Sequence, residues 1–293
     1  MKKYKSRGAF ASESLCDMAA IVIRRLNAHD DYQACLALQK ETWGETFAEC
    51  VPPSLLMVSQ KIGGVAAGAF DASGRLLGFV FGLTGVKDGR LVHWSDLLAV
   101  RPEVRDCGLG QHLKLYQKEQ VQALGVEVMY WTYDPLVARN AHLNLNRLGA
   151  HAEEYVPDMY REDASGALHR GMSLDRFVVA WRLNQEHDQA AVRVTPENFA
   201  PVPVVNTVFD QNNKIIPVEK DLSLASAVRV EIPDDIYAVK AVALEQAVVW
   251  RNTTRRAFLF YQEHGYAVTA FYREESNGRC FYVLRRGEDA IAF

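Results

Sequence analysis

Residues 97–114 read L-L-A-V-R-P-E-V-R-D-C-G-L-G-Q-H-L-K and carry the strongest structural signal in this chain of 293 residues. The pattern predicts a strand that ends at Val100, a turn through Arg105-x-x-Gly108-x-Gly110, and then a helix. Because glycine has no Cβ, the backbone N–H groups of such a turn can converge at the helix N-terminus, where the helix dipole favours an anion. A plain tight turn would use the same two glycines, so the pattern alone leaves both interpretations open.

The runs that flank this turn predict a mixture of strands and helices. Before it, three β-rich runs are joined by glycine-containing turns of the hairpin type, which predicts an antiparallel meander. After it, strand and helix alternate, and the run at residues 126–133 is apolar enough to be buried on both faces. The early strands are expected at residues 65–71, 76–86 and 91–100, after helices at about residues 30–44 and 52–64.

Two familiar nucleotide-binding motifs do not fit this arrangement. The dinucleotide fingerprint requires GxGxxG in a tight parallel unit, and the P-loop requires GxxxxGK[ST]. The meander followed by R-x-x-G-x-G instead resembles the GNAT acyltransferase superfamily, over residues 21–183. The resemblance implies an α/β fold with a central mixed, twisted sheet whose fourth and fifth strands splay apart to admit an acyl-coenzyme A.

The resemblance also assigns residues to the cosubstrate. The backbone of Leu98 and Val100 is implied to pair with the pantetheine arm, much as an added β-strand would. The turn is implied to hold the pyrophosphate through Arg105, Asp106, Cys107, Gly108, Leu109, Gly110 and Gln111.

Residues 131–136 (W-T-Y-D-P-L) and 139–144 (R-N-A-H-L-N) narrow the resemblance to one GNAT subfamily. Its members are mostly predicted acetyltransferases, and it is related to N-succinyltransferases associated with N-acylamino-acid racemases. This implies transfer of an acetyl or succinyl group from acetyl-CoA or another acyl-CoA to a primary amine. A small amino acid or a related metabolite is the favoured acceptor.

The reaction needs a base, because a free amine has a pKa of about 10 and must be neutral to attack a thioester. Asp96 is the candidate, although related sequences often carry histidine there, and a hydrogen bond across the sheet is the alternative role. Strand alternation places Asp96 on the face of Trp94 and Leu98. Asn140 is implied to contact the pantetheine or the thiol, or else lies at the surface. Leu145 stands where many members of the family carry a tyrosine that protonates the leaving thiolate. Because leucine cannot do this, the alternative function is a catalytically inactive acyl-CoA-binding module that acts through a protein partner.

Composition excludes several classes of protein. Hydrophobic residues make up 49% and charged residues 24%, which is typical of a globular protein. A formal net charge of −3 argues against a nucleic-acid partner, and no run approaches the roughly 18 apolar residues of a membrane span. The cysteines are odd in number and scattered, so the sequence predicts neither disulfides nor a metal site. Such cysteine usage favours a cytoplasmic location. The sequence leaves open whether the chain forms a homodimer.

The chain beyond residue 183 predicts a second unit. Residues 1–18 are expected to be a mobile lead-in, 19–183 the acyl-CoA-binding domain, 184–195 a linker, and 196–293 a C-terminal α/β unit. Residues 138–149 and 254–265 both form a helical pattern that ends in glycine before two strands. This indicates either a partial repeat of the first unit or a helix–glycine–strand arrangement that is common in unrelated proteins. One hypothesis is that this unit walls the acceptor pocket and that a cation binds an acceptor carboxylate. The candidate cations are Arg251, Arg255 and Arg256, and the alternative is a packing domain whose Tyr261 is core.

Overall fold

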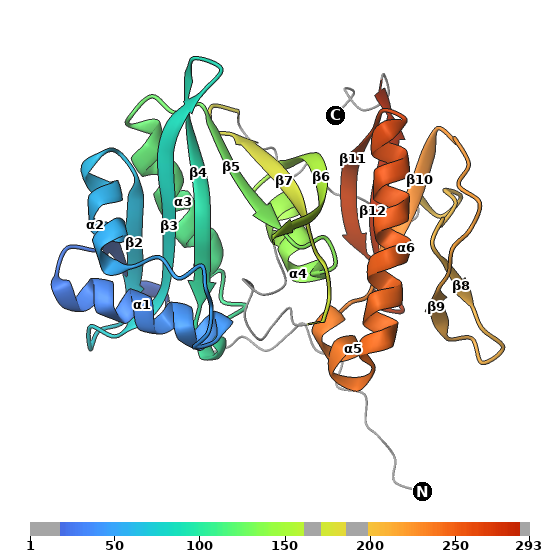
Figure 1. Cartoon of the computed structure of the whole chain (residues 1–293), viewed down its shortest axis with the longest axis horizontal. Coiled ribbons are helices and arrows are strands. Elements are labelled where there is room, and N and C mark those ends of the chain that lie inside the picture. The colour runs from blue at the N-terminus through green and yellow to red at the C-terminus, as the bar shows by residue number, and fades with distance from the viewer. Residues whose placement is uncertain (1–17, 161–170, 186–198, 288–293) are drawn as a thin grey trace, which may run out of the picture.

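The computed structural model describes residues 18–160, 171–185 and 199–287. Within these ranges the chain forms a seven-stranded sheet with helices on both faces, and beside it a smaller α/β unit (Figure 1). The α/β fold with a central mixed sheet that the sequence predicts is confirmed. The expected lead-in and most of the expected linker lie outside the described residues, although Met18 itself begins a short 3-10 helix, Met18–Ala20.

The first half of the large sheet is the antiparallel meander. β2 pairs with β3 and β3 pairs with β4, through the turns that the sequence predicts. The helices α1 and α2 pack against β2 and β3 around buried Leu38, Leu56 and Phe79. The elements are β1 (Val22–Arg25), α1 (His29–Trp43), α2 (Pro53–Lys61), β2 (Val65–Phe70), β3 (Leu76–Lys87) and β4 (Arg90–Val100).

The second half alternates helix and strand and completes the strand order β1-β2-β3-β4-β5-β7-β6. Its elements are α3 (Leu109–Gln122), β5 (Val128–Tyr133), α4 (Ala138–Ala141), the π-helical η3 (His142–Arg147), β6 (His151–Tyr160) and β7 (Leu174–Arg182). β4 and β5 are parallel, whereas β5, β7 and β6 are antiparallel neighbours, so the sheet is mixed.

β4 and β5 pair over only three residues. Val92–Trp94 lie opposite Val128–Tyr130, and no pairing to β5 continues along the rest of β4, although β5 stays paired with β7 as far as Tyr133. Figure 1 shows the two strands diverging from this point. The result is the splay between the fourth and fifth strands that the family resemblance implies.

The C-terminal unit has the topology of the end of the first unit. β10, β12 and β11 are antiparallel in that order, as are β5, β7 and β6, and in both a helix precedes the last two strands. The helical segment of this unit is divided at Ala243, whose extended backbone separates α5 from α6. The elements are β8 (Thr207–Phe209), β9 (Ile215–Pro217), β10 (Ala227–Ile232), α5 (Ile236–Val242), α6 (Leu244–Glu263), β11 (Tyr266–Arg273) and β12 (Cys280–Arg286).

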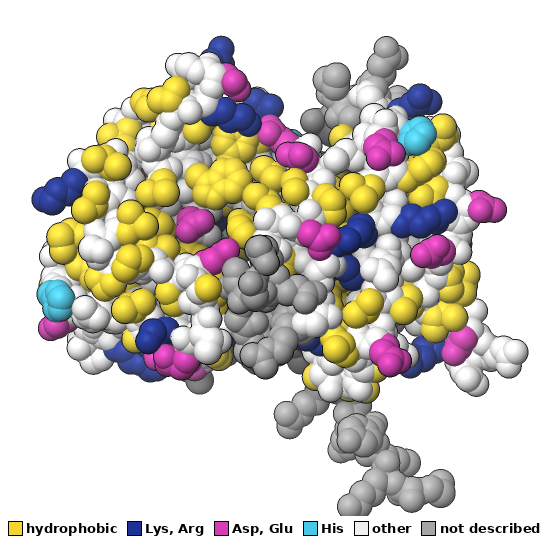
Figure 2. Space-filling model, viewed as in Figure 1, with side chains coloured by type: hydrophobic (Ala, Val, Ile, Leu, Met, Phe, Trp, Pro, Cys, Tyr) yellow, Lys and Arg dark blue, Asp and Glu magenta, His cyan; other side chains and the backbone are white. Residues whose placement is uncertain are grey.

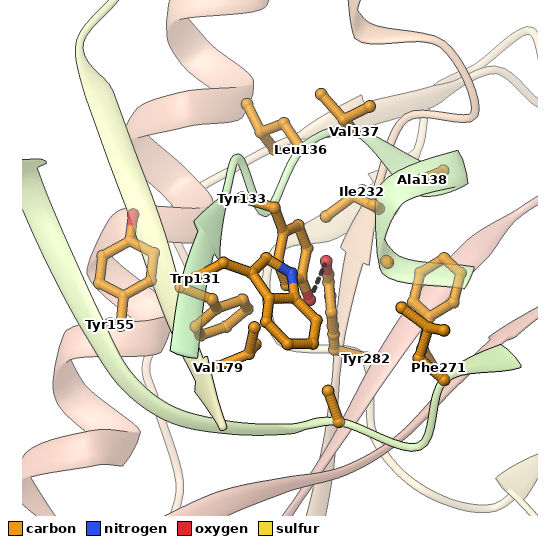
Figure 3. Close-up of a cluster of buried hydrophobic side chains, with 14 of the residues drawn as sticks. Trp131, Tyr133, Leu136, Val137, Ala138, Tyr155, Val179, Ile232, Phe271 and Tyr282 are labelled. Carbon is orange, nitrogen blue, oxygen red and sulfur yellow. Dashed lines mark hydrogen bonds between the residues drawn. The ribbon is translucent and has the colours of Figure 1, made fainter. Parts of the chain in front are cut away.

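The two units share one aromatic core, part of which is drawn in Figure 3. Phe258 of α6 lies 4.8 Å from Phe177 of β7 and 5.4 Å from Tyr282 of β12, measured between ring centroids. The hydroxyl of Tyr282 donates to the carbonyl oxygen of Pro135 at 2.8 Å and lies 3.3 Å from the hydroxyl of Tyr133. Because these side chains are buried only where the units meet, we expect the units to unfold together.

Phe258→Ala tests this coupling. The substitution should destabilise the chain by about 3–5 kcal/mol, the usual cost of removing a buried phenylalanine. Hydrogen exchange should show that the amides of β5 and β7 lose protection together with those of α6. Val249→Ala is the control, because Val249 is exposed on the same helix, and it should change stability by less than about 0.5 kcal/mol. Independent loss of protection in the C-terminal unit would contradict a shared core.

Candidate active site

A β-bulge sets the position of Asp96. Phe81 of β3 lies opposite Leu97 and the next residue, Gly82, lies opposite Ser95, so Asp96 is the extra residue without a partner. Leu97 packs with the core under α1 and α2, whereas Leu98 packs with the core under α3. The predicted alternation is therefore wrong for Leu98, because the bulge shifts the order of faces beyond Asp96.

Asp96 is an exposed carboxylate in a crowded surrounding. Its side chain accepts no hydrogen bond from any described residue, which argues against a hydrogen bond across the sheet. The surrounding protein nevertheless excludes enough water to raise the pKa of Asp96 above its ordinary value of 3.8. Glu49, from the segment between α1 and α2, has a pKa raised by burial and by the charge of Asp96. Figure 2, which views the face of α1 and α2, shows acidic side chains close together there.

Buried polar side chains close the splay on the side of α3. Lys114 donates to the hydroxyl of Ser95 at 2.7 Å, and its Nζ lies 3.9 Å from the ring centroid of Trp131. Gln117 accepts from Ser95 at 2.7 Å, and its amide nitrogen lies 3.0 Å from Nε2 of His93. Burial lowers the pKa of His93 to about 3 and that of Lys114 well below 10.5, so His93 is a neutral structural residue.

Lys114 is not among the residues predicted from the sequence, although its position on α3 carries a signal. Lys114 follows Gly110 by four residues and precedes Gln117 by three, so helical periodicity places it on the buried face of α3. A lysine on such a face is rare enough to mark a site. Here it fills the end of the splay where the strand pairing stops.

The unpaired part of β4 turns its backbone toward the splay. The N–H of Arg101 donates to the carbonyl oxygen of Leu77 at 2.9 Å, so Ala99 and Arg101 direct their backbone groups at β3. Leu98 and Val100 therefore direct theirs to the opposite edge, where β5 has moved away. This edge can pair with an extended ligand, as the resemblance implies for Leu98 and Val100.

The glycine turn leads into α3 without a cap. Asp106 and Gly108 have left-handed backbones, with φ of 64° and 79°, and no side chain caps the helix. A Cβ on Gly110 would meet only side chains of Leu98, Val100 and Leu143, at 3.8–4.0 Å. The first N–H groups of α3 are thus free for an anion, and Gly110 borders the space between β4 and η3.

Cations surround this turn. Nε of Arg105 donates to the carbonyl oxygen of Val100 at 3.1 Å, and burial together with nearby Arg139 lowers the pKa of Arg105. Arg147 donates to the side chain of Gln111 at 3.2 Å. Arg105 and Arg139 therefore place two positive charges near the turn.

Asn140 and its neighbours lie on α4 and η3. Asn140 lies on α4, where its backbone N–H donates to Val137, and its partly exposed side chain makes no hydrogen bond to a described residue. Asn144 is buried and accepts from the indole of Trp131 at 3.1 Å. Leu145 packs against the core, and its apolar side chain cannot donate a proton to a leaving thiolate.

The hypothesis of arginines that bind the acceptor directly is wrong for α6. Arg251 is 2% exposed and pairs with Asp134 at 2.6 Å, and Arg255 pairs with Asp175. Arg256 donates to the carbonyl oxygen of Lys220. Tyr261 is fully buried, with its hydroxyl 3.0 Å from the carbonyl oxygen of Ser223, as expected for a core residue.

Comparisons with known proteins give matches to solved structures. No family model and no curated protein sequence matches the chain. The acetyltransferase yncA of Salmonella typhimurium, solved with acetyl-CoA, is similar over 57% of this chain and 96% of its own, with 18% identity and a TM-score of 0.45. An aminoglycoside 6'-acetyltransferase type Ii is similar over 57% and 99%, with 17% identity and a TM-score of 0.44. The ribosomal-protein-S18-alanine N-acetyltransferase of Escherichia coli is similar over 57% and 97%, with 16% identity and a TM-score of 0.42.

Two kinds of feature are absent from the described ranges of the chain. None of their helices is long and apolar enough to cross a membrane. They also contain no group of three or more His, Cys, Asp or Glu side chains that could hold a metal ion.

Gly110→Val tests the anion-binding turn. The new side chain has room in the folded chain but projects into the space beside Leu98 and Leu143. We expect CoA affinity, measured by calorimetry, to fall at least tenfold while the thermal midpoint stays within a few degrees. Gly85→Val is the control, since Gly85 lies on β3 with open space around its Cα. Equal CoA affinity in both variants would remove the turn from the site.

Proposed function

We propose that this protein is an acyl-CoA-dependent N-acyltransferase that transfers an acetyl or succinyl group to a primary amine of a small metabolite. One observation carries the proposal. The unpaired backbone edge of β4 runs from Asp96 to the uncapped N-terminus of α3. The space between the unpaired parts of β4 and β5, here called the slot, has a carboxylate at one end and cations at the other. This arrangement suits a ligand whose phosphates lie far from its reactive group.

The residues present fit an acyl-CoA. The N–H groups of the turn and the cations Arg105 and Arg139 would hold the pyrophosphate. The backbone of Leu98 and Val100 would pair with the pantetheine, and the amide of Asn140 would donate to it or to the sulfur. The acyl-CoA supplies an activated thioester, so the chain needs to bind, orient and move protons only.

Asp96 is the proposed base. It accepts a proton from the bound ammonium, directly or through a water, and its raised pKa makes it a stronger base than an ordinary carboxylate. Glu49 adds a second negative charge that attracts the ammonium. Backbone N–H groups on the free edge of β4 face the slot and are suited to stabilise the negative oxygen that develops during attack. As the new C–N bond forms, the C–S bond breaks, and the CoA thiolate leaves and takes up a proton from the solvent.

Release of free thiol tests the reaction. Acetyl-CoA and succinyl-CoA should each be incubated with a panel of primary amines, with the acylated product identified by mass spectrometry. Acyl transfer to at least one amine is the expected result, and the preferred thioester identifies the acyl group. Tight CoA binding without turnover on any amine would favour the inactive binding module, which the apolar Leu145 would suit.

The pH profile tests Asp96. The base must be ionised, so kcat/KM should fall as the pH drops through the raised pKa of Asp96, above 3.8. Asp96→Asn should lower kcat about 10²–10⁴-fold, the usual contribution of a general base, and remove this acidic limb. CoA affinity should be unchanged. Glu41→Gln is the control, since Glu41 pairs with Arg101 outside the slot. If the acidic limb of the pH profile persists in Asp96→Asn, another residue is the base.

A further inference from the structure

Arg176 of β7 has an incompletely paired guanidinium. Its side chain is only 13% exposed, yet its one hydrogen bond to a described residue goes from NH1 to the carbonyl oxygen of Asp175, at 3.2 Å. The nearest carboxylate oxygen, Oδ2 of Asp134, is 3.9 Å away, beyond hydrogen-bond distance. A guanidinium has five N–H donors, so most of the fork is available to an anion.

Arg176 lies across the splay from Asp96. Thr132 of β5 is two residues beyond the last β4–β5 pair, as Asp96 is on β4. The hydroxyl of Tyr160 is 3.4 Å from that of Thr132, and the ring of Tyr160 lies 5.3 Å from Cζ of Arg176. Glu49 interacts electrostatically with both Asp96 and Arg176. The splay therefore has carboxylates on one side and a guanidinium on the other.

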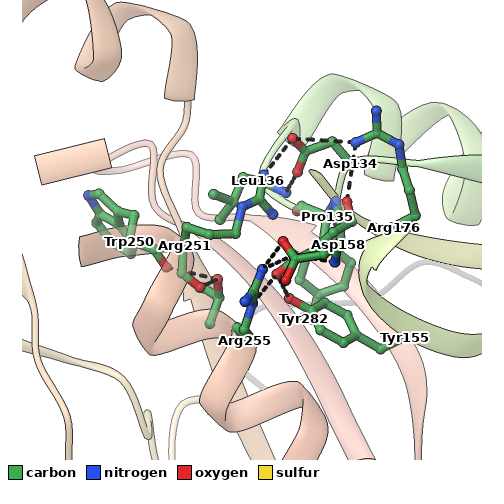
Figure 4. Close-up of polar contacts among 12 residues, drawn as sticks. Asp134, Pro135, Leu136, Tyr155, Asp158, Arg176, Trp250, Arg251, Arg255 and Tyr282 are labelled. Carbon is green, nitrogen blue, oxygen red and sulfur yellow. Dashed lines mark hydrogen bonds and ion pairs between the residues drawn. The ribbon is translucent and has the colours of Figure 1, made fainter. Parts of the chain in front are cut away.

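The C-terminal unit holds the surroundings of Arg176. Arg251 of α6 donates to Oδ2 of Asp134 at 2.6 Å, the same oxygen that faces Arg176. Arg255, one helical turn later, donates to Asp175, the residue before Arg176, through Nε at 2.9 Å. Figure 4 shows Arg251 and Arg255 reaching from α6 to Asp134 and Asp158 of the first unit. Because Oδ2 of Asp134 accepts the hydrogen bond of Arg251, Asp134 attracts Arg176 without accepting a hydrogen bond from its guanidinium.

We propose that the acceptor is an amine that also carries a carboxylate, and that Arg176 binds this carboxylate while Arg251, acting through Asp134, positions Arg176. This inference rests on the proposed acyl transfer. The ammonium lies at Asp96 and Glu49, and the carboxylate pairs with the planar fork of Arg176, for which arginine is suited. Arg251 is a positioning residue that makes no contact with the acceptor.

Matched acceptors test the binding of the carboxylate. Each amino acid of a panel is compared with its carboxamide and with the amine that lacks the carboxyl group. The unmodified chain should prefer the amino acid. Arg176→Gln should lower kcat/KM for the amino acid about 10- to 100-fold, mainly through KM, the range expected for a charged hydrogen bond. The matched amines should change less than twofold. Arg182→Gln is the control on the same strand, since Arg182 is half exposed and 3.9 Å from Glu153.

The positioning role has its own variants. Arg251→Met should raise KM for the amino acid and leave CoA affinity and the KM of the matched amine unchanged, and Arg251→Lys should restore part of the loss. If Arg251→Met does not fold, Asp134→Asn replaces it, because that substitution keeps the shape of the side chain. A fall in kcat/KM that is equal for amino acid and amine would overturn the positioning role.

Calorimetry separates this inference from the proposed function. Amino acids and their carboxamides are titrated into the chain saturated with CoA, which requires no turnover. Binding that favours the amino acid and is lost in Arg176→Gln supports the inference even if no acyl transfer occurs. Equal binding of acid and amide, or an Arg176→Gln variant that binds both as the unmodified chain does, overturns it.

Discussion

The parallel pairing of β4 with β5 covers three residue pairs, and the candidate site depends on where it stops. Beyond Trp94 the β4 edge turns unpaired backbone groups toward the slot, and exposed backbone of this kind requires a partner. β5 remains fixed because β7 occupies its other edge. Lys114 and Trp131 fill the point of divergence, so the splay is held open by packing and not by a missing strand.

The C-terminal unit repeats a strand–helix–strand–strand ending but uses it for a different purpose. In the first unit, the helix at this place borders the slot. In the second, α6 faces the first unit and places two arginines on carboxylates at the ends of β5 and β7. Nε and NH1 of Arg251 are buried without a hydrogen-bond partner, which is costly. A buried pair of this kind adds little stability, and we infer that it is retained because it fixes geometry.

Much of the fold could be predicted from the sequence, because local signals agree with the final structure. The hairpin turns, Gly108 and the alternation after residue 109 each specify one conformation. The orientation of Leu98 could not be predicted, since a bulge at Asp96 changes no residue type and only the register with β3 reveals it. The arginines of α6 were predicted to bind a ligand because sequence shows their charge but not Asp134 and Asp175, which come from distant segments.

Charge is separated along the slot, and this separation favours one direction of binding. Arg105 and Arg139 lie at the turn, where they would attract phosphates. Asp96 and Glu49 lie near the other end of the slot, where β4 and β5 are paired. A polyanion that entered in reverse would meet carboxylates, and like charges at short range repel. The same carboxylates attract an ammonium on the face of α1 and α2. In the proposed reaction, the acyl-CoA and the amine would therefore approach from opposite faces of the sheet and meet where the pairing of β4 and β5 ends.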